Sequence, residues 1–287
     1  MKIQSLSVVV PAKKCVNDCM FCVSKMHESE HEDMMSHKNL YYDLYKKDYS
    51  NRLMFARDNG CNTVMLTGDC EPTQNRSFLA KFGDFNQALP DPFKVIEMQT
   101  AGNLLDSNML YFLRHHVGVT TISLSVSDLW DDDNNCEIIG CDFFQLANLC
   151  REIKKYRFNL RLSLNVLDNI ESHSIYDTFE RAKRFGADQV TFRKMYLWDN
   201  VTDEGKWLDE HNVKPIFWDK LNAVVESHGK VIDRLEYGRT KYSILDMGVV
   251  IDDDCMSQEV NDVAKYVILR PNAKLYSKWE TKASLIF

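Results

Sequence analysis

The sequence predicts an α/β fold in which six strands alternate with helices and form a parallel sheet. The first observation behind this prediction is a junction that occurs three times, in which a glycine stands four residues before a β-branched residue. The three junctions are Gly60 with Val64, Gly118 with Ile122 and Gly186 with Val190. Glycine readily takes the left-handed conformation that ends a helix, so each junction indicates a helix running into a short buried strand.

The second observation is the apolar spacing in the segments that precede these glycines. Apolar residues recur there every three or four positions, which is the pattern of a helix with one buried face. The three series are Tyr41, Tyr45, Tyr49 and Leu53; Leu105, Met109, Phe112 and Leu113; and Ile175, Phe179 and Ala182. Strands are predicted near residues 3–10, 63–67, 95–99, 121–125, 160–165 and 190–193. Helical segments separate them throughout, so the sequence predicts six successive βα units.

The pattern changes after about residue 196. A helix is predicted around residues 217–227, and strands near residues 231–235, 248–251 and 266–269. Pro271 and Asn272 supply the residues of a turn between two strands. We therefore expect residues 1–200 to hold the βα units and residues 201–287 to form a small α+β cap.

The composition narrows the classes of partner and the cellular compartment. The chain of 287 residues has 42 acidic and 35 basic side chains, a net charge of −7, which argues against nucleic acid or an anionic membrane as a partner. The early apolar run, Leu6 to Val10, is too short for a signal peptide core or a membrane span. With nine cysteines, an odd number, we expect a reducing, cytoplasmic location and thiols that bind metal or are buried.

Three cysteines, Cys15, Cys19 and Cys22, lie within eight residues directly after the first predicted strand. Thiolates are the soft ligands that iron–sulfur clusters require, and this spacing lets one loop ligate three irons of a four-iron cluster. Two alternatives remain at this point. Cys19 and Cys22 could bind zinc with His27 or His31, although the second close ligand pair of such a site is missing. The thiols could also be simply buried, which fits poorly with a polar loop.

The spacing CxxxCxxC with an aromatic residue, Phe21, before the last cysteine resembles the signature of the radical S-adenosylmethionine (radical SAM) superfamily. The resemblance covers roughly residues 3–200. It implies a partial (β/α)6 TIM-like barrel with the cysteine triplet on the loop after the first strand. It also implies that Cys15, Cys19 and Cys22 bind a 4Fe-4S cluster and that S-adenosylmethionine binds beside it.

The end of the second predicted strand, residues 67–75, resembles the Gly-Gly-Glu-Pro segment of that superfamily. This resemblance implies that Gly68, Asp69, Cys70 and Glu71 contact the cofactor, with Glu71 receiving its methionine amino group. The match departs from the pattern because the second glycine is replaced and Cys70 precedes the glutamate.

The later strand ends offer further candidates for cofactor binding. Gln99 to Gly102 is similar to a Thr-Asn-Gly turn of the superfamily, which makes Thr100 a candidate, although an ordinary βα turn explains it equally well. Ser125, Asn165 and Arg193 stand at the ends of the fourth, fifth and sixth strands. In the superfamily such positions contact the ribose, adenine and carboxylate, and an arginine can pair with a carboxylate through two hydrogen bonds.

The resemblance implies an enzyme that cleaves S-adenosylmethionine reductively to a 5′-deoxyadenosyl radical, which abstracts hydrogen from a substrate. It also implies a one-electron donor such as flavodoxin or ferredoxin. Because the triplet starts at Cys15, we expect no N-terminal peptide-recognition domain and a small-molecule substrate, for example a nucleotide-like one as in viperin-like enzymes. The alternatives are a ribosomal-peptide maturase, an RNA methylase that uses Cys255, and a zinc-binding interaction module without catalysis.

Overall fold

The computed structural model describes residues 2–26, 30–31, 43–142, 145–235, 238–253, 259–260 and 263–287. The predicted α/β fold is confirmed. The strands are β1 (Lys2–Val9), β2 (Thr63–Thr67), β3 (Val95–Thr100), β4 (Thr121–Val126), β5 (Asn159–Val166), β6 (Gln189–Lys194), β7 (Lys230–Arg234), β8 (Thr240–Ile244), β9 (Met247–Asp252), β10 (Glu259–Val260), β11 (Val263–Leu269) and β12 (Leu275–Tyr276).

The helices lie between the strands, as the apolar spacing predicts. They are α1 (Val23–Met26), α4 (Lys46–Asp58), α5 (Arg76–Ala88), α6 (Ser107–Phe112), α7 (Asp132–Ile139), α8 (Leu146–Lys155), α9 (Ile175–Arg184), α10 (Asp203–His211) and α11 (Pro215–His228). A π-helical turn, Leu113–Val117, follows α6, and a 3₁₀ turn, Pro72–Gln74, follows β2. Of these helices, none is long and apolar enough to cross a membrane.

One sheet contains all the strands listed above. Its order is β10-β11-β1-β2-β3-β4-β5-β6-β9-β8-β7, and β12 pairs with β11. Every neighbouring pair from β11 to β9 is parallel, so eight parallel strands form the centre of the sheet. The pairs beyond these eight strands are antiparallel.

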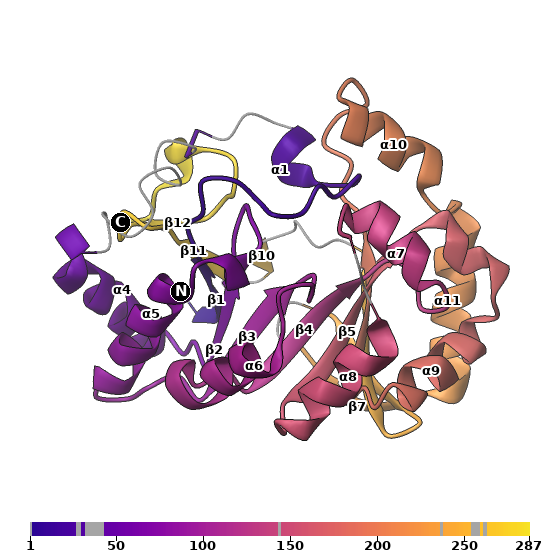
Figure 1. The fold of residues 1–287 in the computed structure, drawn as a ribbon, viewed down its shortest axis with the longest axis horizontal. Coiled ribbons are helices and arrows are strands. Elements are labelled where there is room, and N and C mark those ends of the chain that lie inside the picture. The colour runs from indigo at the N-terminus through magenta and orange to yellow at the C-terminus, as the bar shows by residue number, and fades with distance from the viewer. Residues whose placement is uncertain are drawn as a thin grey trace.

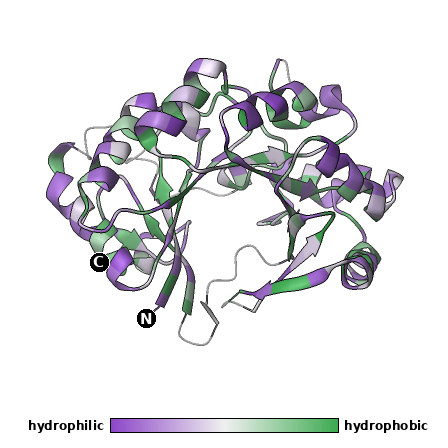
Figure 2. Ribbon diagram, turned by 90° about the horizontal axis from the view of Figure 1, so that it is seen from below, coloured by the Kyte–Doolittle hydropathy of each residue, from purple (hydrophilic) through white to green (hydrophobic). Residues whose placement is uncertain are grey.

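The sheet curves into a partial barrel with the helices on its outside (Figures 1 and 2). The two end strands of the parallel run, β11 and β9, share no backbone pairing among the described residues. Their side chains nevertheless meet, because the Lys265 ammonium on β11 lies 3.1 Å from the Asp252 carboxylate on β9. The curvature therefore brings both edges of the sheet to one interior, as in a barrel with an open side.

The C-terminal elements predicted from the sequence are present as α11, β7, β9 and β11, and the predicted turn joins β11 to β12. The strands among these elements extend the barrel sheet at both edges, with β11 beside β1 and β9 beside β6. The sheet is therefore continuous across residue 200. The division into a barrel and a separate cap stays a prediction.

The three glycine junctions have the predicted conformation. Gly60, Gly118 and Gly186 have φ angles of 86°, 82° and 78°, which an L side chain rarely adopts. Each ends a helical segment and precedes a strand by a few residues. Glycine at these positions therefore sets where three of the helices stop and the sheet resumes.

Alternation along the strands separates a helix-facing core from a polar interior. On β5, Leu160 and Leu162 are fully buried in the core shared with the helices, whereas Arg161 and Asn165 line a cavity inside the barrel. TIM barrels usually fill this interior with bulky branched side chains. Here a cavity lined by both polar and apolar side chains leaves room for ligands instead.

Gly83 marks a close contact between α5 and the π-helical turn. A Cβ atom at Gly83 would lie 2.4 Å from the carbonyl oxygen of His116 and 3.0 Å from Cα of Val117. Both atoms belong to backbone, which cannot move aside cheaply. We expect Gly83→Ala to lower the free energy of unfolding by about 1–3 kcal/mol, measured by urea denaturation. The exposed neighbour variant Asp84→Ala should stay within about 0.5 kcal/mol of the parent chain. A Gly83→Ala protein as stable as the parent would contradict the packing described.

Candidate functional site

The three cysteines of the triplet lie on the loop that joins β1 to α1. This loop leaves the carboxyl end of β1 and crosses that end of the sheet (Figure 1). All three thiols are partly exposed and form no disulfide. Functional groups of parallel barrels gather at the carboxyl ends of the strands, and the triplet has that position.

One side of the cysteine loop is held by the segment that follows β2. The Gln74 side-chain amide donates to the carbonyl of Lys14 at 2.8 Å and accepts from the backbone N–H of Val16 at 3.0 Å. The backbone N–H of Glu71 donates to the Cys15 sulfur at 3.2 Å. Hydrogen bonds therefore hold the backbone on both sides of Cys15 and also its sulfur. Sequence reasoning did not assign a role to Gln74, because no spacing or motif distinguishes it from an ordinary turn residue.

The other side of the loop rests on the C-terminal end of α7. The backbone N–H groups of Asp18 and Met20 donate to the carbonyls of Ile139 and Ile138 at 3.0 and 2.9 Å. These bonds satisfy helix-end carbonyls that have no partner inside the helix. Gly140 makes the approach possible, since a Cβ there would lie within 2.7–2.9 Å of Asp18 atoms.

The three thiols differ in their readiness to ionise. A hydrogen bond from the Cys70 thiol, together with backbone N–H groups, lowers the pKa of Cys15 to about 6. Burial raises the pKa of Cys19 to about 12 and also raises the pKa of Cys22. A metal that binds all three sulfurs must therefore displace protons from Cys19 and Cys22 at neutral pH.

The donor set fits a cluster better than a single ion. Within the described part of the chain, no three His, Cys, Asp or Glu side chains converge so as to hold one metal ion. A zinc site needs such convergence, whereas a four-iron cluster takes each of three thiolates on a different iron. His31 is buried against the ring of Tyr276, with centroids 4.8 Å apart, and burial lowers the pKa of its imidazole to about 4. His27 lies outside the described residues.

A cavity of about 570 Å³ runs through the barrel interior below the cysteine loop. It brings together many of the residues predicted from the sequence. Those that line it are Cys19, Phe21, Cys22, Gly68, Asp69, Ser125, Asn165 and Arg193. Cys15, Cys70, Glu71 and Thr100 are not among its lining residues. A molecule in this cavity would touch two of the three cysteines and the ends of four strands.

Glu71 ties the end of β2 to the end of β3. Its buried carboxylate accepts hydrogen bonds at Oε1 from the backbone and hydroxyl of Thr73, at 3.1 and 2.6 Å, and from the hydroxyl of Thr100 at 2.7 Å. At Oε2 it accepts from the backbone N–H of Ala101 at 2.9 Å. Oε2, with one bond, is the oxygen left for a cofactor amino group, and that role of Glu71 stays a prediction. Thr100 contacts Glu71, and its own role in cofactor binding also stays a prediction.

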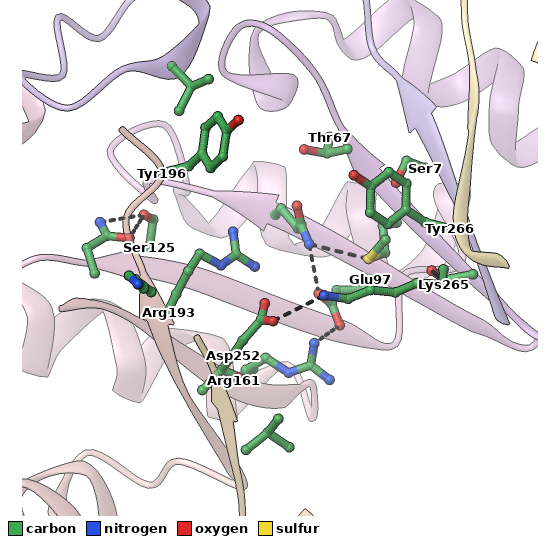
Figure 3. A pocket seen from close by; sticks show the side chains of 18 of the residues that line it. Ser7, Thr67, Glu97, Ser125, Arg161, Arg193, Tyr196, Asp252, Lys265 and Tyr266 are labelled. Carbon is green, nitrogen blue, oxygen red and sulfur yellow. Dashed lines mark hydrogen bonds and ion pairs between the residues drawn. The ribbon is translucent and has the colours of Figure 1, made fainter. Parts of the chain in front are cut away.

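Ser125, Asn165 and Arg193 come from three neighbouring strands. The Asn165 amide donates to the hydroxyls of Ser125 and Ser127 at 3.0 and 3.1 Å. The Arg193 side chain extends into the cavity (Figure 3), and its Nε is buried without a hydrogen-bond partner. Leaving a buried donor unpaired costs about 1–3 kcal/mol, so this position favours a ligand that brings an acceptor.

Charged side chains that sequence reasoning missed line the same cavity. Glu97 and Arg161 form an ion pair of 2.6 Å, and Asp252 and Lys265 form the pair across the open side (Figure 3). Alternation along β3 and β5 could have revealed Glu97 and Arg161, because they share a strand face with Gln99 and Asn165. Asp252 and Lys265 could not be placed without knowing which strands border the barrel opening.

A buried arginine joins the C-terminal segment to the loop after β2. Arg270 has no exposed surface, and its guanidinium donates to the Asp69 carboxylate at 2.9 Å and to the carbonyl of Trp279 at 2.6 Å. The neighbouring Gly68 lies close to β1, since a Cβ there would be 3.0 Å from the carbonyl oxygen of Val10. The backbone of this turn is therefore held close against the cysteine loop.

Comparison with solved structures identifies the fold. Coproporphyrinogen III oxidase (HemN) from Escherichia coli, described as a radical SAM enzyme, superposes with a TM-score of 0.53 at 12% identity, over 80% of this chain and 54% of HemN. The fold is that of the radical SAM enzymes. This confirms the partial barrel that the resemblance of the CxxxCxxC spacing implies.

Two further solved structures resemble the chain. Streptococcus suis SuiB bound to precursor peptide SuiA has a TM-score of 0.55 at 18% identity, over 79% of this chain and 46% of SuiB. The structure of anSMEcpe with bound AdoMet and Kp18Cys peptide has a TM-score of 0.59 at 11% identity, over 99% of this chain and 77% of that one. The chain spans about half the length of SuiB. No protein-family model and no curated protein sequence matches the chain.

Removing the triplet tests the metal assignment. We expect Cys15→Ala, Cys19→Ala and Cys22→Ala together to abolish iron and sulfide binding after anaerobic reconstitution, because no other described thiols are gathered in one loop. Iron content and visible absorbance measure the loss. Cys150→Ala, which removes a buried thiol from α8, should retain the cluster. Full iron content in the triple variant would show that other side chains are the ligands.

The Arg270–Asp69 pair can be tested through stability. We expect Arg270→Met to lower the free energy of unfolding by about 3 kcal/mol, because it leaves the Asp69 carboxylate without its cation in a largely buried place. Adding Asp69→Asn should recover part of that loss, measured by thermal and urea unfolding. A loss in the double variant equal to the sum of the losses in Arg270→Met and Asp69→Asn alone would show that the two charges are not coupled.

Proposed function

We propose that the chain is a radical SAM enzyme whose 4Fe-4S cluster is held by Cys15, Cys19 and Cys22 and whose cofactor lies in the barrel cavity. When bound, the cluster and S-adenosylmethionine supply the reductive cleavage that yields a 5′-deoxyadenosyl radical, which takes a hydrogen atom from the substrate. The main support is geometric: the loop with the triplet lies over a polar cavity that Cys19 and Cys22 themselves line.

In this proposal the protein supplies position and electrostatics. Gln74 and the Glu71 N–H orient Cys15, and an N–H bond to a cluster sulfur is one of the ways a protein adjusts the reduction potential. Arg193 offers its unpaired Nε to the cofactor carboxylate. Ser125 and Asn165 are candidates for the ribose and adenine. A one-electron donor such as flavodoxin or ferredoxin would complete the cycle.

The substrate we propose is a polar small molecule, a class that includes nucleotide-like compounds. The cavity volume lies within the range of about 300–1,000 Å³ that small-molecule sites occupy. Glu97, Arg161, Asp252 and Lys265 line the part of the cavity inside the sheet, so a ligand there meets charged groups as well as the apolar side chains of the lining.

Peptide maturation is the second candidate. It is favoured by the structures of SuiB with its precursor peptide and of anSMEcpe with a bound peptide, which share the fold. The RNA methylase alternative depends on Cys255, which lies outside the described residues.

Turnover of the cofactor tests the proposal. We expect the reconstituted, dithionite-reduced protein to convert S-adenosylmethionine to 5′-deoxyadenosine and methionine under anaerobic conditions, measured by liquid chromatography and mass spectrometry. A fully clustered sample that forms no 5′-deoxyadenosine, alone or with cell extract, would overturn the proposal. Extract separated by ultrafiltration distinguishes the substrate classes: stimulation by the filtrate supports a small molecule, and stimulation by synthetic precursor peptides supports a maturase.

Arg193 provides a test within the cavity. We expect Arg193→Gln to weaken S-adenosylmethionine binding by about 10- to 100-fold, because a charge-assisted hydrogen bond contributes about 1.5–3 kcal/mol. Equilibrium dialysis with the clustered protein measures the affinity. Arg184→Gln, which removes an exposed arginine from α9, should bind as the parent does. Unchanged affinity in Arg193→Gln would remove Arg193 from the cofactor site.

A further inference from the structure

The backbone at the C-terminal end of helix α7 forms a motif that places two cysteine side chains next to each other. The N–H of Cys141 donates to the carbonyl of Cys136 at 3.0 Å, and the N–H of Gly140 donates to the carbonyl of Glu137 at 3.3 Å. Gly140 has a φ angle of 69°. These are the two bonds of a Schellman motif, in which the side chains at the positions of Cys136 and Cys141 characteristically contact each other.

The motif places the two side chains next to each other, and both are accessible. Each is partly exposed while packing against the same core. Burial and the neighbouring Cys141 thiol raise the pKa of the Cys136 thiol to about 11. A disulfide requires the sulfurs to approach to about 2.05 Å, and the Schellman geometry already places the two side chains next to each other.

The same helix end carries the loop of the cysteine triplet. The carbonyls of Ile138 and Ile139 accept from the loop backbone at Met20 and Asp18. Gly140, which stands between the two thiols in the chain, has no space for a side chain because Asp18 is packed against it. Any movement of Cys141 toward α7 therefore acts on the backbone that supports the loop.

We propose that Cys136 and Cys141 are a site of reversible disulfide formation whose oxidation state is transmitted to the triplet loop. The oxidant is a low-molecular-weight disulfide such as glutathione disulfide. One protein thiolate attacks it and releases a first glutathione, and the second protein thiol, losing its proton, attacks the mixed disulfide and releases another. Two protein thiols and one glutathione disulfide thus become one protein disulfide and two glutathione thiols. Formation of the disulfide does not depend on the proposed function. Only the inference that the disulfide regulates an enzyme rests on the proposed function.

The other described cysteines provide the controls. Cys61 and Cys150 are fully buried, so they are matched controls for thiol removal. Cys70 also lies near Cys15, whose pKa it lowers, and the two thiols could be oxidised together in a chain without a cluster. The experiment therefore uses the clustered protein and, in parallel, the chain with Cys15, Cys19 and Cys22 all changed to alanine.

Peptide mapping tests disulfide formation. Both samples are incubated anaerobically with glutathione disulfide, alkylated, digested without reduction and analysed by mass spectrometry. We expect loss of alkylation at Cys136 and Cys141, one cross-linked peptide, and full recovery with dithiothreitol. Cys136→Ser should abolish the cross-link and leave a mixed disulfide with glutathione, and Cys150→Ser should retain the cross-link. Free thiols at both positions, or mixed disulfides alone in the parent chain, would overturn the proposal.

Amide hydrogen exchange tests the transmission to the loop. We expect the exchange rates of the Asp18 and Met20 amides to shift between the reduced and oxidised forms of the clustered protein. The double variant Cys136→Ser and Cys141→Ser should show no shift with the same oxidant. Equal rates in both forms of the parent chain would overturn the coupling. Neither measurement requires cofactor cleavage, so a chain that forms the disulfide but makes no 5′-deoxyadenosine would contradict only the proposed function.

Discussion

The site depends on the support of one irregular loop by two elements that are distant from it in sequence. A loop that must present three thiols cannot satisfy its own backbone groups, and polar backbone groups without partners are costly. Here the Gln74 amide bonds on both flanks of Cys15, and the last carbonyls of α7 accept from Asp18 and Met20. These bonds hold the backbone of the cysteine loop, and with it the three thiols, in a defined position.

A second constraint is the polarity of the barrel interior. Alternation places leucines of β5 against the helices and Arg161 and Asn165 inside, so the helix-facing core stabilises the fold while the interior stays available for ligands. Buried charges are costly unless they are paired, and Glu97 with Arg161 and Asp252 with Lys265 meet that condition. Arg193 differs from these paired charges because its buried Nε has no hydrogen-bond partner.

Local signals in the sequence were sufficient for much of the fold and for part of the site. Apolar spacing and the left-handed glycines predicted helices alternating with the strands β1 to β6, because these features depend on neighbouring residues. The position of the triplet after β1 followed from the same signals. Local signals could not place β9 and β11 at opposite edges of the sheet, since strand pairing over such separations is decided by packing. They also missed the pair of Asp252 with Lys265 for this reason. They missed Gln74 and Arg270 because each bonds to a segment distant in sequence and carries no motif of its own.

The pairing of β11 with β1 also affects how the chain reaches its native state. Ser5 on β1 bonds to the carbonyl of Lys265 on β11, a contact 260 residues apart. Contacts of such separation carry a large loop-closure entropy and slow the folding of a domain. During synthesis the outer edge of β1 stays without its partner strand until β11 has left the ribosome. The last strand to join the parallel part of the sheet is therefore β11. It pairs with β1, the strand that leads into the cysteine loop.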